Sequence, residues 1–192
     1  MLDDLQSKLA RIEEVKADLE DVDTRVNAYD IDTVNKDNLP DLEELIEKIE
    51  ELKTSTNVTD EEKAHLDELL DKIAELEARI EEVERALEEA RKQAEEAARI
   101  NAGNVTPGDQ TTLENALDGY TNALGVFDSN LSLSDLFDVN NRISIISSAL
   151  DILDQVAEFE AMISRLPNPE DVDYSSRLLI KAAEGAYGAL NR

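Results

Sequence analysis

The sequence predicts an all-α, elongated protein made of two tandem three-helix bundles with spectrin-like, coiled-coil packing. Three observations favour this fold. Apolar residues recur every three or four positions over most of the 192 residues, capping pairs mark several helix starts, and no long apolar-polar alternation predicts a sheet. A period of three to four residues places apolar side chains along one face of a helix, where they pack against partner helices.

Six helices are expected, at residues 2–29, 39–54, 59–101, 111–127, 133–165 and 173–191. The first carries the apolar spacing from Leu5 to Tyr29. The third carries ten evenly spaced apolar residues: Leu66, Leu69, Ile73, Leu76, Ile80, Val83, Leu87, Ala90, Ala94 and Ala97. At 1.5 Å per residue this helix is roughly 60 Å long, which suits an elongated molecule better than a compact one.

Capping pairs and helix breakers set the helix ends. The candidate caps are Thr59 with Glu62, Thr111 with Glu114, Ser132 or Ser134, and Asp173. Gly103, Pro107 and Gly108 break the chain, and six of its seven aromatic residues follow this point. We therefore expect one bundle in residues 1–101 and a second in residues 102–192, joined near residues 101–110.

An internal repeat is suggested by comparing the sequence with itself. Residues 38–49 lie over residues 132–143, which is an offset of 94 positions. In this alignment Leu39 and Asp41 match Leu133 and Asp135. The simplest explanation is two diverged three-helix units in tandem.

Charge and composition exclude several classes of function. The chain has 46 acidic and 19 basic residues, a net charge of -27, so we expect no nucleic-acid binding, which needs clustered Lys and Arg. No apolar run reaches eighteen residues, so no membrane insertion is expected. The first residues lack the apolar segment of a signal peptide. The absence of cysteine rules out disulfides and thiolate metal sites.

An aspartate-rich stretch, "YDIDTVNKDNLPDL" at residues 29–42, invites comparison with a calcium loop. An EF-hand needs oxygen ligands at positions 1, 3 and 5, glycine at 6 and a bidentate Glu at 12. Counting from Asp30, Val34 and Asn35 occupy positions 5 and 6 and break this pattern. We interpret the stretch as a corner between two helices, with Asp37 or Asn38 as the cap and Pro40 in the first turn. Ordered calcium binding is the weaker alternative.

Other catalytic arrangements do not stand out. His65 is the only histidine, and we interpret it as a surface or boundary residue. Close carboxylate pairs are expected by chance among so many acids, and residues 101–110 lack the Lys and spacing of a phosphate-binding loop. We therefore expect no enzyme activity, no catalytic residues, no cofactor and no metal site.

Aromatic residues are the best candidates for partner contacts. At helical spacing most of them are expected in the core. Phe127 and Tyr174 adjoin loops and have the best claim to exposure. We take Phe127, Phe137 and Tyr174 as candidate protein-binding residues.

A family resemblance is carried by "DNLPDLEELIEKIEELKTSTNVTDEEKAHLDELLDKIAEL" and "EAMISRLPNPEDVDYSSRLLIKAAEGAYGAL". These segments resemble the helical repeat modules of Gram-positive bacterial cell-surface proteins, three-helix-bundle repeats such as the FIVAR and albumin-binding-module types. The resemblance covers about 70 of the 192 residues and implies a surface-exposed stalk or adhesive module.

The helical periodicity, the acidic charge and this resemblance together lead to one functional expectation. We expect a non-catalytic structural or interaction module of a bacterial surface protein, located at the cell surface or secreted as part of a larger protein. Its partners would be another protein or neighbouring repeats of the same chain, and the chain itself would be a monomer. The alternative is a cytoplasmic coiled-coil scaffold or assembly subunit, in which the apolar stripes pair between chains.

Overall fold

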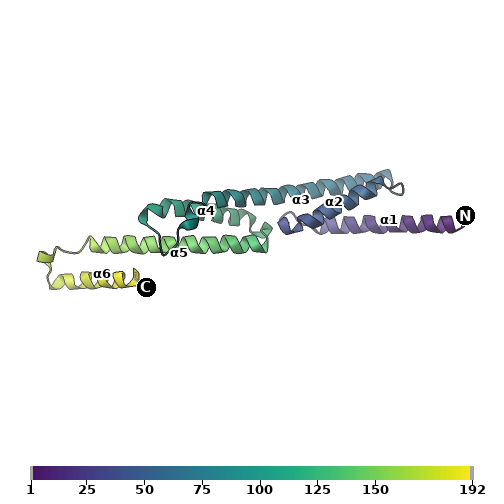
Figure 1. The fold of residues 1–192 in the computed structure, drawn as a ribbon. Coiled ribbons are helices and arrows are strands. Elements are labelled where there is room, and N and C mark those ends of the chain that lie inside the picture. Colours follow the sequence, from purple (N-terminus) through teal and green to yellow (C-terminus); the bar gives the residue numbers. More distant parts are fainter. Residues whose placement is uncertain (1, 191–192) are drawn as a thin grey trace. The chain divides into compact units, whose positions relative to one another are not determined.

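The protein is all-α in the computed structural model, which describes residues 2–190 except the side chains of Asp3 and Leu190. Six α-helices follow one another: α1 (Leu2–Ala28), α2 (Leu39–Thr54), α3 (Asp60–Gln93), α4 (Gln110–Phe127), α5 (Leu133–Ile163) and α6 (Arg177–Leu190) (Figure 1). No strand occurs within residues 2–190. The predicted fold class and the order of the helices are confirmed.

Two predicted helix ends differ from the structure by more than two residues. The third helix ends at Gln93, and a turn and a short 3-10 helix (Ala97–Arg99) replace its predicted last residues. The sixth begins at Arg177, because a 3-10 turn (Tyr174–Ser176) follows the cap at Asp173. In both places a 3-10 helix lies between the α-helix and a corner, which is common at helix ends.

The chain forms two compact units whose limits differ from the predicted bundles. The first unit contains the residues up to Leu87 together with Gly125–Leu136, and the second contains Glu88–Leu124 and the residues from Phe137 onward. The expected junction at residues 101–110 lies inside the second unit. Gly103, Pro107 and Gly108 turn the chain between α3 and α4, and a turn that connects two helices of one bundle need not separate two domains.

The core of the first unit is built from α1, α2 and α3. Figure 1 shows α2 beside α1, and the buried side chains of the three helices form one cluster. Its fully buried members are Val22, Val26, Val34, Leu42, Leu45, Ile49, Leu66, Ile73 and Leu76. The three- and four-residue spacing directs one side of each helix toward the other two.

The apolar stripe predicted along the third helix is confirmed, since all ten of its residues are buried. The stripe predicted along α1 is buried only in the second half of that helix. Val22 and Val26 are inaccessible to solvent, whereas Leu5 and Leu9 are exposed by 57% and 55%. Half of α1 therefore carries apolar residues that nothing in the first unit covers.

One corner conformation occurs three times in the chain. We call it the long corner; its copies are residues 30–38, 101–109 and 168–176. In each copy an Asp or Asn begins a turn, a valine follows four positions later, and a capping box precedes the next helix. The capping pairs are Asn35 with Asn38, Thr106 with Asp109, and Asp173 with Ser176.

The hydrogen bonds that hold the turn at the start of the long corner are the same in the first two copies. The carboxylate of Asp30 accepts from the backbone N–H of Asp32 at 3.0 Å, and the side-chain oxygen of Asn101 accepts from that of Gly103 at 2.9 Å. The backbone N–H of Val34 donates to the carbonyl of Asp30, as that of Val105 donates to the carbonyl of Asn101. Asp and Asn suit this position because their short side chains bond to the backbone two residues on.

A second, shorter corner occurs twice. We call it the short corner; its copies are residues 55–59 and 128–132, "STNVT" and "DSNLS". Each ends in a hydroxyl residue that forms a capping pair three residues ahead, Thr59 with Glu62 and Ser132 with Asp135. Both satisfy the first N–H groups of a long helix.

These corners correct the internal repeat expected from the sequence. Asp30 and Asn101 are 71 residues apart, Asn57 and Asn130 are 73 apart, and Asn101 and Asn168 are 67 apart. The offset of 94 aligned the helix start after a long corner with the helix start after a short corner. Helix starts resemble one another in sequence because all need a cap and an apolar first turn. The structural repeat is close to 70 residues and occurs with three long corners.

Burial of the apolar stripe predicts a contrast between two identical substitutions. Leu45→Ala in α2 removes a fully buried side chain and should lower the free energy of unfolding of the first unit by about 2–5 kcal/mol. Leu5→Ala in α1 removes an exposed one and should change it by less than about 0.5 kcal/mol. Urea unfolding followed by far-UV circular dichroism compares the two, and equal losses would contradict the assigned core.

Candidate interaction surfaces

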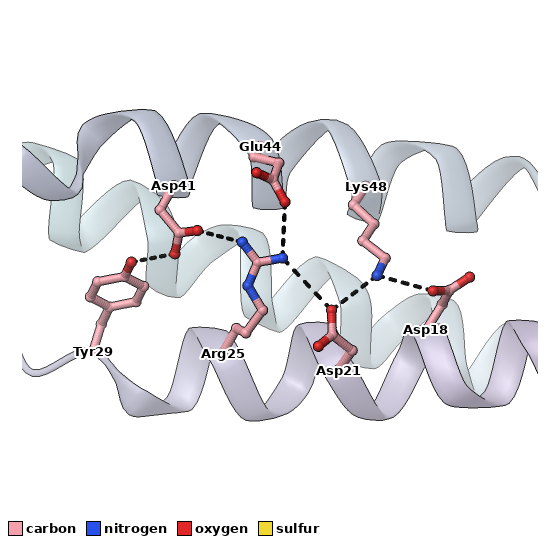
Figure 2. Close-up of polar contacts among 7 residues, drawn as sticks. All are labelled: Asp18, Asp21, Arg25, Tyr29, Asp41, Glu44 and Lys48. Carbon is pink, nitrogen blue, oxygen red and sulfur yellow. Dashed lines mark hydrogen bonds and ion pairs between the residues drawn. The ribbon is translucent and has the colours of Figure 1, made fainter.

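A row of charged side chains connects α1 to α2. Arg25 of α1 contacts Asp41 and, at 3.0 Å, Glu44 on α2 (Figure 2). Lys48 of α2 contacts Asp18 at 3.0 Å and Asp21 at 2.9 Å on α1. Each cation therefore lies between two carboxylates of the facing helix.

The pKa values along this row are shifted by the contacts between its members. Hydrogen bonds from Tyr29 and Arg25 hold the pKa of Asp41 below its ordinary value. A hydrogen bond from Lys48 does the same for the pKa of Asp21. Burial, assisted by the bond to Asp41, raises the pKa of Tyr29 to about 12. A general acid needs a carboxyl group with a raised pKa, and these carboxylates are shifted the other way.

The aspartate-rich stretch of residues 29–42 is a corner between α1 and α2, as interpreted from the sequence. Asp30 holds the backbone turn, whereas the carboxylate of Asp41 accepts hydrogen bonds from Tyr29 and Arg25. Asn38, one of the two expected caps, is the N-cap residue of α2, although its side chain makes no capping hydrogen bond to that helix. Its side chain instead forms a capping box with Asn35 around the 3-10 turn Lys36–Asn38. Pro40 lies in the first turn of α2 as predicted. Within the described part of the chain, no group of three or more His, Asp or Glu residues could hold a metal ion.

The second short corner is bound to the first long corner inside the first unit. The side-chain amide of Asn130 donates to the backbone carbonyls of Ile31 and Val34, both at 2.9 Å. Arg79 of α3 donates to the carbonyl oxygen of the Asn130 side chain at 3.1 Å. Asn130 is only 3% exposed, so its amide is fully used in a site shielded from water.

Two more contacts occur in the same part of the first unit. The guanidinium of Arg79 lies over the ring of Phe127, 4.8 Å from its centroid, a cation–π arrangement. Lys36 of the long corner pairs with Asp135, whose carboxylate is 5% exposed. A carboxylate at this depth needs a cation, because burial without one is unfavourable.

The three candidate protein-binding residues lie in different environments. Phe127 is 8% exposed and lies against Arg79, so the expectation that its ring is available to a partner is wrong. Position next to a loop did not expose it, because that loop is itself packed. Phe137 and Tyr174 are exposed by 77% and 85%, and these two rings remain candidate contacts.

A groove of about 510 Å³ lies within the second unit. Its lining includes Arg91, Tyr120, Asp138, Arg142 and Ile146. Asp138 pairs with Arg91 and with Arg142, at 3.7 Å in each case. Burial raises the pKa of Tyr120. The groove thus has apolar walls and charges that are already paired with one another.

His65 connects two helices at the surface. Its Nε2 lies 2.7 Å from the carboxylate of Asp23 on α1, and its Nδ1 lies 3.4 Å from Glu68 on α3. The Asp23 contact, followed by the Glu68 contact, raises the pKa of His65. The surface position inferred from the sequence is where the structure places it.

The residues that bind the two corners together were not singled out from the sequence. Asn130, Arg79, Lys36 and Asp135 come from separate elements, and no local spacing connects them. One signal was present. The short corners "STNVT" and "DSNLS" share an asparagine, an aliphatic residue and a hydroxyl residue in the same order.

Comparisons with known proteins yield no match for this chain among protein-family models, curated proteins or solved structures. Of the helices in the described range, none is long and apolar enough to cross a membrane.

The buried amide of Asn130 predicts a position-specific loss of stability. Asn130→Ala leaves two carbonyls and the guanidinium of Arg79 without their partner and should lower the free energy of unfolding by about 1–3 kcal/mol. Asn57→Ala is the matched control, because Asn57 has the equivalent place in the first short corner and is exposed. Its effect should stay within about 0.5 kcal/mol. Chemical unfolding of both variants tests this, and indistinguishable midpoints would contradict it.

The His65 contacts predict a pH dependence with a definite sign. A raised pKa in the folded state means that the stabilisation is fully present below the unfolded value of about 6.5 and is lost as pH rises through the folded value. Because the pair is exposed, the effect should stay below about 1 kcal/mol. His65 is the only histidine, so its ring protons give its pKa directly by NMR. Asp23→Asn should lower that pKa, and an unchanged value would disprove the contact.

Proposed function

We propose that this chain is a non-catalytic structural and interaction module of a bacterial surface protein, acting as a stalk or as an adhesive, protein-binding repeat. The observation that carries the proposal is the long corner, which recurs at intervals of 71 and 67 residues. A repeated supersecondary unit that packs on its neighbours is the architecture of arrays that extend by adding copies.

The polar residues support a structural role. The most prominent polar network, along α1 and α2, consists of ion pairs and hydrogen bonds between helices. Among side chains that the structure describes, every buried nitrogen and oxygen atom has a hydrogen-bond partner. A catalytic site commonly keeps groups with shifted pKa values directed into a cleft, whereas these groups hold helices and corners in place.

The adhesive form of the proposal rests on Phe137 and Tyr174. Both rings are more than three-quarters exposed, and aromatic rings are enriched among the residues that dominate protein–protein binding. Tyr174 lies in one of the segments that carry the family resemblance, and Phe137 lies outside both of them. A host or matrix protein is therefore the expected partner class.

An adhesive role predicts that binding depends on these two rings. The full chain, immobilised and exposed to serum and extracellular-matrix proteins, should retain a partner that Phe137→Ser or Tyr174→Ser releases, with affinity lowered at least about tenfold for a dominant contact. Val126→Ser, at another exposed apolar side chain, is the control. Binding that survives both substitutions contradicts the role of these rings. Absence of any partner leaves the stalk role alone, and protease treatment of intact producing cells then tests surface location.

The second candidate function is a cytoplasmic coiled-coil scaffold or assembly subunit. The exposed apolar residues in the first half of α1 favour it, since such a stripe can pair between chains. Analytical ultracentrifugation over a wide concentration range separates the two proposals. A dimer that dissociates on dilution favours the scaffold, and a monomer at all concentrations excludes pairing through α1.

A further inference from the structure

The first half of α1 is the counterpart of a buried part of α3. A shift of 71 residues, the spacing of the first two long corners, places Leu2, Leu5, Leu9 and Ile12 on Ile73, Leu76, Ile80 and Val83. The four residues of α3 are at most 3% exposed, whereas those of α1 are 40–70% exposed. All eight are aliphatic, so the difference lies in what covers them.

Two segments contact this part of α3, one through the buried cluster that contains Val34 and Ile73 and the other through the hydrogen bond from Arg79. One is the long corner at residues 30–38, and the other is the short corner at residues 128–132. Val34 in the first is buried, and Asn130 in the second donates to the backbone around it. Arg79, on the same stretch of α3, contacts Asn130 and the ring of Phe127. A helix, a long corner and a short corner thus form one junction.

The first half of α1 has two of the three parts of this junction. The first short corner, residues 55–59, is present beside it. A groove of about 420 Å³ is lined by Arg11 and Val15 of α1 and by Ser55 and Asn57 of that corner. Lys8 has the position of Arg79 and Asn57 that of Asn130. Both Lys8 and Asn57 are exposed. The missing part is a long corner.

We propose that residues 2–12 of α1 and the first short corner form an acceptor surface for the long corner of a preceding copy of this repeat, joined to α1 through a continuous helix. The partner is defined by its chemistry: a long corner with a valine that enters the apolar stripe and free backbone carbonyls that accept from Asn57. The inference goes beyond the proposed function, because it holds for a surface stalk and for a cytoplasmic scaffold alike.

The geometry of the internal junction favours a copy on the same polypeptide over a second chain. In the first unit the long corner at 30–38 and the short corner at 128–132 meet on α3, a single helix that lies between them in the sequence. A second chain would bring its own helix with its corner, so that two helices would compete for the place of one. A preceding copy supplies the corner and shares the helix.

The test adds that copy to the full chain. In the first extended chain, residues 13–72 precede Leu2, so that Lys72 is followed by Leu2 and the 71-residue period is kept. In the second, only residues 60–72 precede Leu2, which lengthens the helix without supplying a long corner. Hydrogen exchange measured by mass spectrometry reports on residues 2–12, which occur only once in each chain.

The corner-bearing chain should protect the amides of residues 2–12 by at least about tenfold more than the original chain does. The helix-only extension should give markedly less protection. Asn57→Ala in the original part should reduce the protection in the corner-bearing chain and leave it unchanged in the original chain. Equal protection by both extensions would overturn the proposal, because lengthening the helix would then explain the whole effect.

Sedimentation of the original chain tests the alternative that a second chain covers residues 2–12. A monomer with weakly protected residues 2–12 is the expected result. A dimer in which these residues are protected, and in which Leu9→Glu restores the monomer, would overturn the assignment to a preceding copy and identify a second chain as the occupant. Glu13→Lys, a charge change on the next turn of α1 at an exposed residue, is the control for charge alone.

Discussion

Burial of one apolar stripe by more than one partner is the constraint on which this structure depends. A helix cannot cover its own apolar face, so each stretch of stripe needs two neighbours, and the corners determine where those neighbours lie. On α3 the need is met from Leu66 to Ala90. On α1 it is met only from Val22 onward among the fully buried residues. The contrast between these two helices is the basis of the repeat, of the proposed stalk and of the acceptor surface.

Polar groups select the register in which the stripes meet. Aliphatic side chains tolerate small shifts along a helix, whereas a buried amide such as that of Asn130 has one arrangement that satisfies its donors and its acceptor. The pair of Lys36 with Asp135 adds a second fixed point in the same junction. The half-exposed row from Arg25 to Lys48 contributes less stability for each contact, because water and salt screen it. It still aligns α1 with α2 through contacts at several successive turns.

Local signals predicted the elements, and the two main errors concern the end of α3 and the burial of Phe127. The bounds of α2 agree with the prediction at both ends because Pro40 and a capping residue mark its start. The predicted third helix ran past Gln93 because the apolar spacing continues through Ala94 and Ala97 after the α-helix has ended. Phe127 was expected to be exposed because it precedes a loop, but the loop packs and Arg79 lies on the ring. The burial of Phe127 was missed because Arg79, a residue far along the chain, decides its environment.

The sequence by itself determined the helices, the stripe of α3 and the corner at residues 29–42, because periodicity, caps and proline act within a few residues. Only the tertiary structure decided the period of the repeat, the units and the burial of Asn130 and Asp135. The reason is physical. All helix starts in an acidic helical chain resemble one another, so an alignment of starts cannot distinguish a long corner from a short one. The packed junction distinguishes them, because only a long corner presents its carbonyls to an asparagine 96 and 99 residues away.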